Sequence, residues 1–160
     1  TDALVTELRG LLVRVRGVFD APARSDAVSL DALLATWSRI IDLRAHIDPA
    51  ARALLEAGAT AAQDAYDVAA EGILNAVKHS GERRAEVLLD VVATGAGPAL
   101  RVRVRSSAPL SAGAELRPAS HVRSLGATLR STSEGAVLEA LIRVDAPARD
   151  GSVVSAEHPV

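Results

Sequence analysis

The sequence contains no cysteine, only 2% aromatic residues and no long apolar run. Without cysteine, a disulfide scaffold and a thiolate metal site are excluded. No apolar stretch approaches the roughly 20 residues that a membrane span needs, so we expect no membrane contact. The formal net charge of -2 provides no basic excess for binding nucleic acid. Disulfide-rich, membrane-spanning and nucleic-acid-binding classes are therefore set aside.

What is present is enough for one domain. The 160 residues are 49% hydrophobic, which supports a substantial core and a short appendage. Thr1 is not an initiator methionine, and no signal-peptide pattern follows it. We therefore expect a piece of a longer protein that is cytoplasmic, or that forms the cytoplasmic part of a membrane-bound sensor.

The first 19 residues are patterned as an amphipathic helix. Apolar residues recur at intervals of three and four, the spacing of one helix face. They are Leu4, Leu8, Leu11, Leu12, Val15 and Phe19. The pattern ends near Gly17, and the turn-rich residues 20–29 predict a linker.

A short helix and a strand are predicted next. Ser29 or Asp31 is placed to cap a helix that runs to about Arg39. Its expected buried side is formed by Leu30, Leu33, Leu34 and Trp37. Residues 39–47, RIIDLRAHI, then have the composition of a strand.

A long helix is predicted to follow this strand. Asp48 and Pro49 are a helix-start signal, with aspartate as the cap and proline at the first helical position. Gly58 is the residue at which a break in this helix is expected, if there is one. The helical periodicity then resumes, and the helix is expected to end at residues 80–81, Ser-Gly.

Residues 85–94 and 100–105 predict two strands joined by the turn-forming GAGP. In RVRVR, valine alternates with arginine, so the valines are expected on a buried face. The opposite face carries Arg101, Arg103 and Arg105. Two interpretations remain for those arginines: a solvated outer sheet face, which is the more common case, or an anion-binding face.

The rest of the chain predicts a loop, a short helix and a second hairpin. Residues 106–118 have loop composition, 121–126 predict a short helix, and the hairpin turns at 133–135. Residues 146–160 are expected to be a flexible tail. Residues 30–145 therefore predict an α+β two-layer sandwich, with a mixed sheet packed on helices.

The segment EGILNAVKHS, near the end of the predicted long helix, combines a core face with a polar face. At about 100° per residue, Glu71, Asn75, Lys78 and His79 fall within roughly one 100° sector. The apolar residues of the segment lie well away from that sector: Ile73, Leu74 and Val77. The four polar residues form a stripe that we call the polar stripe.

This segment resembles the N-box of the ATP-binding domain of sensor histidine kinases, within the GHKL ATPase superfamily (HATPase_c), and especially its nitrate-sensor-like branch. The later segment SLGATLRSTSEGAVLEALI is similar to the family's closing turn, strand, turn and strand. The likeness spans about residues 1–145 and implies a Bergerat-type ATPase fold. Residues 1–19 then correspond to the end of the dimerisation helix that precedes this domain in such kinases.

The resemblance implies roles for the polar stripe. Asn75 would be the Mg²⁺ ligand, and Glu71 a catalytic carboxylate that orients water or the metal. Lys78 and His79 would lie toward the phosphates of ATP. Carboxylate, amide and cationic groups are what Mg²⁺-nucleotide chemistry needs. ATP and Mg²⁺ are therefore the cofactors expected if the site works.

Several family residues are replaced. Ser106 stands where the family has the aspartate that binds the adenine amino group, and a neutral hydroxyl is a weaker partner than a carboxylate. The glycine boxes and a family threonine are also changed. The replacing residues are Ser107, Ala108, Leu110, Arg117, Pro118 and Ala136. Side chains at glycine positions oppose a close backbone approach to the nucleotide.

The sequence therefore predicts the degenerate C-terminal ATPase-like domain of a sensor histidine kinase-related two-component protein. It would be a pseudokinase, weak or silent toward ATP, acting as a homodimer through residues 1–19 and binding a response regulator or a partner kinase. The alternative is an active Mg²⁺-ATP-binding catalytic domain that phosphorylates a histidine outside this chain. A serine kinase of the anti-sigma-factor type is disfavoured by the N-terminal helix.

Other candidate residues give weaker evidence of a functional site. His46 and His121 lack an acidic residue at the spacing of metal ligands, and we interpret both as structural or solvated. Ser106 and Ser107 lack the surroundings of a nucleophile elbow. No histidine-acid pair of a phosphoacceptor helix is present, so autophosphorylation within this chain is not expected.

Overall fold

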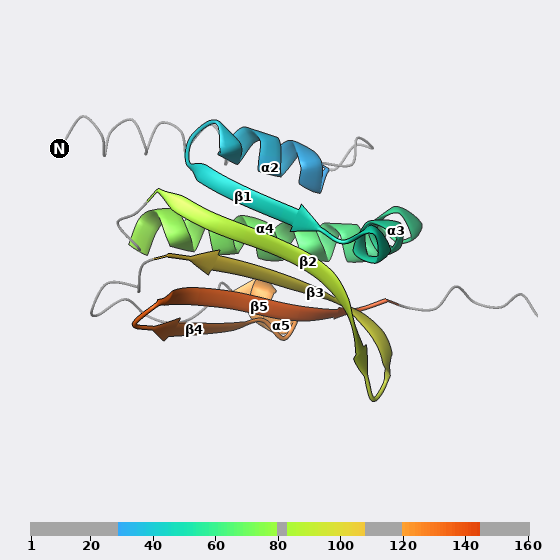
Figure 1. The fold of residues 1–160 in the computed structure, drawn as a ribbon. Helices are drawn as coiled ribbons and strands as arrows, with labels where there is room; N and C mark the ends of the chain where they lie inside the picture. Colours follow the sequence, from blue (N-terminus) through green and yellow to red (C-terminus); the bar gives the residue numbers. More distant parts are fainter. Residues whose placement is uncertain (1–28, 80–82, 108–119, 145–160) are drawn as a thin grey trace, which may run out of the picture.

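The computed structural model describes residues 29–79, 83–107 and 120–144. The predicted N-terminal helix (1–19), most of the predicted linker, the loop at 108–119 and the tail lie outside these residues. The described chain forms one layer of helices against one layer of strands (Figure 1). This confirms the predicted α+β two-layer arrangement.

The helices begin with α2, Leu30–Ser38, whose N-terminus is capped by Ser29. The Ser29 hydroxyl accepts a 3.1 Å hydrogen bond from the backbone N–H of Ala32. Asp31, the other predicted cap, instead receives a 3.0 Å hydrogen bond from Arg52. The side chains predicted for the buried face are all buried: Leu30, Leu33, Leu34 and Trp37.

The predicted long helix is divided at Gly58. The first part is α3, Pro49–Ala57, and the second is α4, Ala59–His79. The start at Pro49 and the position of Asp48 as the N-cap residue are confirmed, but the Asp48 side chain makes no capping hydrogen bond. The Asp48 carboxylate pairs with His46 Nε2 at 3.0 Å. The predicted helix end at residues 80–81 lies outside the described chain.

The sheet has five strands in the order β1-β2-β3-β5-β4. They are β1 (Asp42–Ile47), β2 (Arg84–Thr94), β3 (Gly97–Ser106), β4 (Thr128–Thr132) and β5 (Gly135–Arg143). Only β1 and β2 run parallel, and the other neighbours are antiparallel. The predicted strand at 39–47 is three residues too long at its start, because the Arg39 backbone N–H closes the end of α2.

Both predicted hairpins are confirmed, one through β2 and β3 and the other through β4 and β5. The predicted short helix is α5, Ser120–Ser124. The helices cover one face of the sheet, and α4 lies across β2, β3 and β5 (Figure 1). One apolar cluster joins the buried side chains of this interface, and the valines of RVRVR belong to it. The other face of the sheet, which we call the outer face, is turned to the viewer in Figure 1.

Within the described residues, no helix is both long enough and apolar enough to cross a lipid bilayer.

Candidate functional site

The polar stripe occupies the last turns of α4. The Asn75 side-chain amide donates a 3.4 Å hydrogen bond to Glu71 Oε1, and both side chains are half-buried. Lys78 is exposed. His79 is the last residue of α4, and its side chain lies outside what the structure describes. The i, i+4 spacing of Glu71 and Asn75 thus produces the contact that helix geometry predicts.

The fold brings Asn75 of the polar stripe next to Ser106, which the resemblance aligns with a family aspartate. Asn75 on α4 and Ser106 at the end of β3 line the same cavity, although they are far apart in the sequence. Its other lining residues are Gly72, Ala76, Val104, Leu129, Ala136 and Leu138. Three sequence-predicted positions, Asn75, Ser106 and Ala136, therefore meet at one place between helix and sheet.

This cavity is small. Its volume is about 10 Å³, which is room for about one water molecule. Sites that enclose small organic ligands typically measure about 300–1,000 Å³. The surrounding side chains are mostly apolar, and Val104 and Leu138 are only 2% exposed. The described residues around Asn75 and Ser106 thus leave a cavity much smaller than an adenine ring.

Ser106 is itself part of the packed interior. It is 3% exposed, and its Oγ accepts a 3.3 Å hydrogen bond from the backbone N–H of Ala136, its register partner on β5. Gly135, with φ +140°, brings its backbone so close that a Cβ there would lie 2.0 Å from the Ser106 carbonyl oxygen. The Ser106 hydroxyl therefore helps to hold the end of β3 against the start of β5.

Gly72 is a further residue of this site, and the sequence reasoning missed it. A Cβ at Gly72 would lie 2.5 Å from the Cβ of Val104. The absence of a side chain lets α4 approach β3 closely enough to close the space between them. The sequence did contain a signal for Gly72. A glycine inside a strongly helical segment lowers helix stability by about 1 kcal/mol relative to alanine, and usually has a packing reason.

The α4 face that leads to the polar stripe is acidic. Asp64, Asp67 and Glu71 recur at three- and four-residue intervals on that face. Partial burial raises the pKa of the Asp64 carboxyl, and the nearby Asp67 charge raises it further. The described residues contain no cluster of three or more histidine or acidic side chains able to hold a metal ion.

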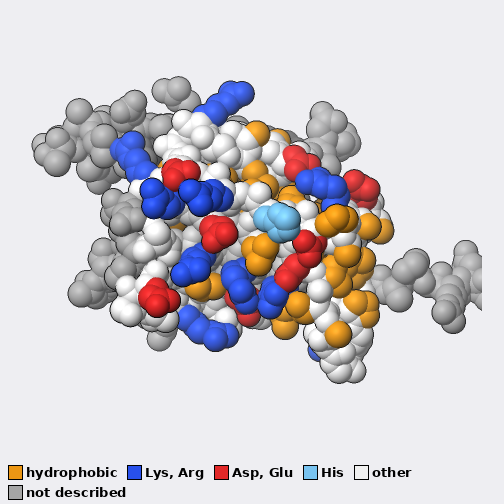
Figure 2. Space-filling view, viewed as in Figure 1, with side chains coloured by type: hydrophobic (Ala, Val, Ile, Leu, Met, Phe, Trp, Pro, Cys, Tyr) orange, Lys and Arg blue, Asp and Glu red, His pale blue; other side chains and the backbone are white. Residues whose placement is uncertain are grey.

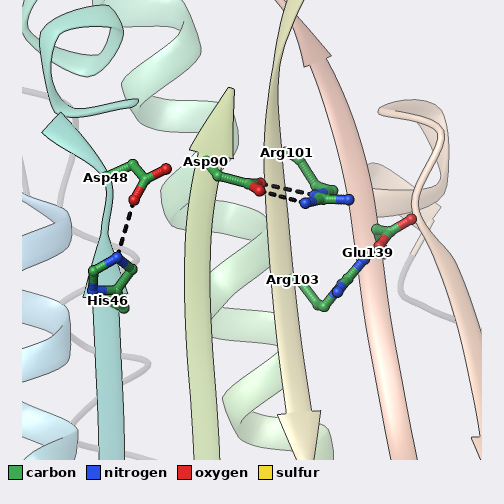
Figure 3. A network of polar contacts seen from close by, with 6 residues as sticks. All are labelled: His46, Asp48, Asp90, Arg101, Arg103 and Glu139. Carbon is green, nitrogen blue, oxygen red and sulfur yellow. Dashed lines mark hydrogen bonds and ion pairs between the residues drawn. The ribbon is translucent and has the colours of Figure 1, made fainter. Parts of the chain in front are cut away.

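His46 and Asp48 form a pair that the sequence reasoning excluded. His46 Nε2 and Asp48 Oδ1 are 3.0 Å apart, with side chains 69% and 46% exposed (Figure 3). The i, i+2 spacing at the end of β1 was the signal, since such residues lie on one side of a strand. The pair lies on the outer face, in register with Leu88, so it takes no part in the cavity. His121 is exposed on α5.

The predicted alternation of valine and arginine on β3 is confirmed. Val102 and Val104 are buried, and the arginines lie on the outer face. Arg101 donates to both carboxylate oxygens of Asp90, and Arg103 Nε donates to Glu139 Oε2 at 2.8 Å (Figure 3). The hydrogen bond from Arg101 lowers the pKa of Asp90. Arg105 is exposed.

Comparison with solved structures identifies a shared fold. The chain is similar to the blue-light activated histidine kinase EL346 of Erythrobacter litoralis, with a TM-score of 0.50 and 17% identity over 72% of this chain and 40% of that one. The chain thus shares its fold with part of a histidine kinase. It spans well under two thirds of that relative. No family model and no curated protein matches the sequence.

Two further structures give weaker likenesses. The histidine kinase domain from EL346 has a TM-score of 0.48 and 18% identity, covering 78% of this chain and 72% of that one. The histidine kinase AdeS of Acinetobacter baumannii has a TM-score of 0.44 and 11% identity, covering 90% of this chain and 98% of that one.

Proposed function

We propose that this chain is the ATPase-like domain of a histidine kinase-related two-component signalling protein, and that its nucleotide pocket no longer accepts ATP. In this proposal the domain is a pseudokinase. It acts by self-association through residues 1–19 and by binding a response regulator or a partner kinase. The shared fold with a histidine kinase and the N-box resemblance of EGILNAVKHS support the kinase ancestry.

The observation that carries the proposal is the cavity of about 10 Å³ between Asn75 and Ser106. By resemblance, adenine would enter between these two side chains. Val104 and Leu138 line that space and are buried, and Gly72 lets α4 lie close against β3. A purine could enter only if this packed interface opened, which would expose apolar surface at a cost of about 25 cal/mol per Å². A hydrogen bond from adenine to a neutral serine would not offset that free-energy cost.

One observation favours the active alternative. The Glu71–Asn75 contact and the exposed Lys78 preserve half of a Mg²⁺-phosphate site. In the active alternative, ATP would bind through its phosphates, and the histidine to be phosphorylated would lie outside this chain. The two proposals predict opposite responses to nucleotide.

A thermal-shift measurement separates them. Ligand that binds at 100 times its Kd stabilises the native state by about 2.7 kcal/mol, so a working site would raise Tm visibly. We expect millimolar Mg²⁺-ATP to leave the Tm of the chain unchanged relative to magnesium chloride at equal ionic strength. The matched control is Asn75→Ala, which removes the proposed metal ligand. A Tm increase that Asn75→Ala abolishes would show that the pocket works and would contradict the proposal.

Self-association can be tested in the full chain. We expect sedimentation equilibrium to show a dimer, because the apolar stripe of residues 1–19 would be buried against a second copy. Replacing Leu8 and Leu12 by glutamate should yield a monomer, whereas Arg9→Glu, off the stripe, should not. A parent chain that is monomeric at the highest concentrations measured would rule out this mode of association.

A further inference from the structure

We propose that the outer face of the sheet carries a binding site for a phosphate group, held between Arg105 on β3 and Arg130 on β4. This site is separate from the cavity beside Asn75 and does not rest on the proposed function. Figure 2 shows the face concerned: basic and acidic side chains are interspersed over the sheet, and hydrophobic side chains gather toward the right.

Strand register places the two arginines on either side of one residue of β5. Val137 is the partner of Arg105 on one side and of Arg130 on the other. Two inter-strand spacings, about 9–10 Å, therefore separate the backbones of the two arginines. Residues in register point to the same face of a sheet, so both arginine side chains lie on the face of Val137, and all three residues line one groove.

The two arginines differ from their neighbours in having no ion pair. On the same face, Arg101 is paired with Asp90 and Arg103 with Glu139. Arg105 and Arg130 are exposed, and no carboxylate lies within ion-pair distance of either in the part of the chain that the structure describes.

Glu86 does not neutralise them. It is in register with Arg105 but equally with Arg44 on its other side. The register thus forms one row across the sheet, which contains three arginines and one carboxylate: Arg44, Glu86, Arg105, Val137 and Arg130. The excess positive charge lies at the β3–β5–β4 end of the row, where Arg105 and Arg130 are.

A groove lies between these side chains. Its volume is about 320 Å³, at the lower end of the range for small-ligand sites. It is lined by Arg103, Arg105, Arg130, Thr132, Glu134, Gly135, Val137 and Glu139. Glu139 is engaged by Arg103 at 2.7 Å. Glu134, which is exposed at the β4–β5 turn, also lines the groove, so three arginines face two glutamates and leave one positive charge in excess. Arg105 and Arg130 are the arginines of the groove that lie outside the Arg103–Glu139 pair.

Phosphate fits this arrangement better than a carboxylate. A phosphate monoester carries a charge of about -1.5 to -2 at pH 7 and three acceptor oxygens. Those oxygens point in different directions, so two guanidinium forks that approach from opposite sides can each bind a pair of them. A carboxylate has two coplanar oxygens and one charge, and would leave one arginine unsatisfied. The ligand is therefore a phosphate group, either free or esterified.

The site is distinct from the family's nucleotide site. Ser106, Ala136 and Leu138 face α4 and line the small cavity, whereas their sequence neighbours Arg105 and Val137 line the groove on the opposite face. Successive residues of a strand point to opposite faces. One sheet layer therefore separates the two sites.

NMR titration of the full chain tests the site. The probe is inorganic phosphate at constant ionic strength, followed through the side-chain Nε–H signals of Arg105 and Arg130. We expect saturable shifts of both signals, and at least ten-fold weaker binding in the double variant Arg105→Gln, Arg130→Gln. Arg143→Gln is the matched control, because Arg143 is exposed on the same face of β5 but lies outside the groove. This control should bind as the parent does.

Titrations with other ligands identify what the site binds. Acetate should bind at least ten-fold more weakly than phosphate, and equal binding would overturn the assignment to phosphate. Inorganic phosphate and a phosphoserine peptide are then compared. Tighter binding of inorganic phosphate would identify a free ion as the ligand, and tighter binding of the peptide would identify an esterified phosphate. Linear, non-saturating shifts, or saturable binding that persists in the double variant, would overturn the proposal. If Mg²⁺-ATP raises Tm and only the double variant abolishes the rise, the nucleotide is bound here by its phosphates.

Discussion

Ser106 makes a structural contact at a position where the family resemblance implies a ligand-binding residue. Its hydroxyl accepts a hydrogen bond from the Ala136 N–H, and 3% of its surface is exposed. A carboxylate in the same place would be enclosed by Val104, Leu129 and Leu138. An ion without a cationic partner in apolar surroundings is strongly destabilising.

Ser106→Asp should therefore destabilise the chain without restoring nucleotide binding. We expect a loss of more than about 2 kcal/mol in the free energy of unfolding, measured by urea denaturation, because a buried charge lacks compensation. Ser106→Ala, which only removes the hydroxyl, should cost about 1 kcal/mol. A Ser106→Asp chain that keeps its stability and acquires a Tm increase with Mg²⁺-ATP would contradict a closed pocket.

The packing of α4 on β3 depends on one helical glycine. Gly72 faces Val104 at a distance that leaves no room for a methyl group, since a Cβ would meet the Val104 Cβ at 2.5 Å. In an exposed helix the same change would be favourable by about 1 kcal/mol. Here steric overlap outweighs propensity, because both partners belong to packed elements that cannot move separately.

Gly72→Ala should destabilise the chain by about 1–3 kcal/mol, the usual range for overpacking. Gly58→Ala is the matched control: its backbone φ is -138°, and a Cβ would lie 3.8 Å from the nearest atoms, an ordinary contact. It should be neutral or slightly stabilising. Urea denaturation of the two variants measures the contrast. A stabilised Gly72→Ala chain would mean that α4 and β3 are not held as closely as described.

At the scale of the whole molecule, one apolar cluster joins the described helices to the sheet, and ion pairs connect the central strands on the outer face. The Asp90–Arg101 pair is the best protected, with side chains 19% and 27% exposed. It joins β2 to β3 across the hairpin. Stability of the whole fold should therefore respond to protonation of this carboxylate.

We expect acid to remove the contribution of this pair. The hydrogen bond from Arg101 lowers the pKa of Asp90 in the folded state, so its stabilisation is complete above the unfolded value of about 3.9. It is lost as pH falls through the lowered folded pKa. Asp90→Asn should cost about 1–2 kcal/mol at pH 7 and much less below that pKa. Fluorescence of the single, buried Trp37 reports unfolding. An equal cost at both pH values would contradict this role.

Much of the local structure was predictable from the sequence alone. Alternation of valine and arginine on β3, the Ser29 cap and the turn residues of both hairpins are signals that act within a few residues. The polar stripe was equally readable, because helical spacing places Glu71 beside Asn75. Such features depend on local geometry, which the order of residues determines.

Contacts between distant segments were decided only by the tertiary structure. Ser106 was expected at a weakened adenine site, and the structure places it beside a cavity of about 10 Å³ where α4 approaches β3 at Gly72. The arginines of β3 were treated alike in the sequence, yet two found carboxylates on neighbouring strands, while Arg105 came into register with Val137 and, beyond it, Arg130. Periodicity determines which face a side chain occupies, but its partner on that face depends on strand order and register, which arise only when the whole chain has folded.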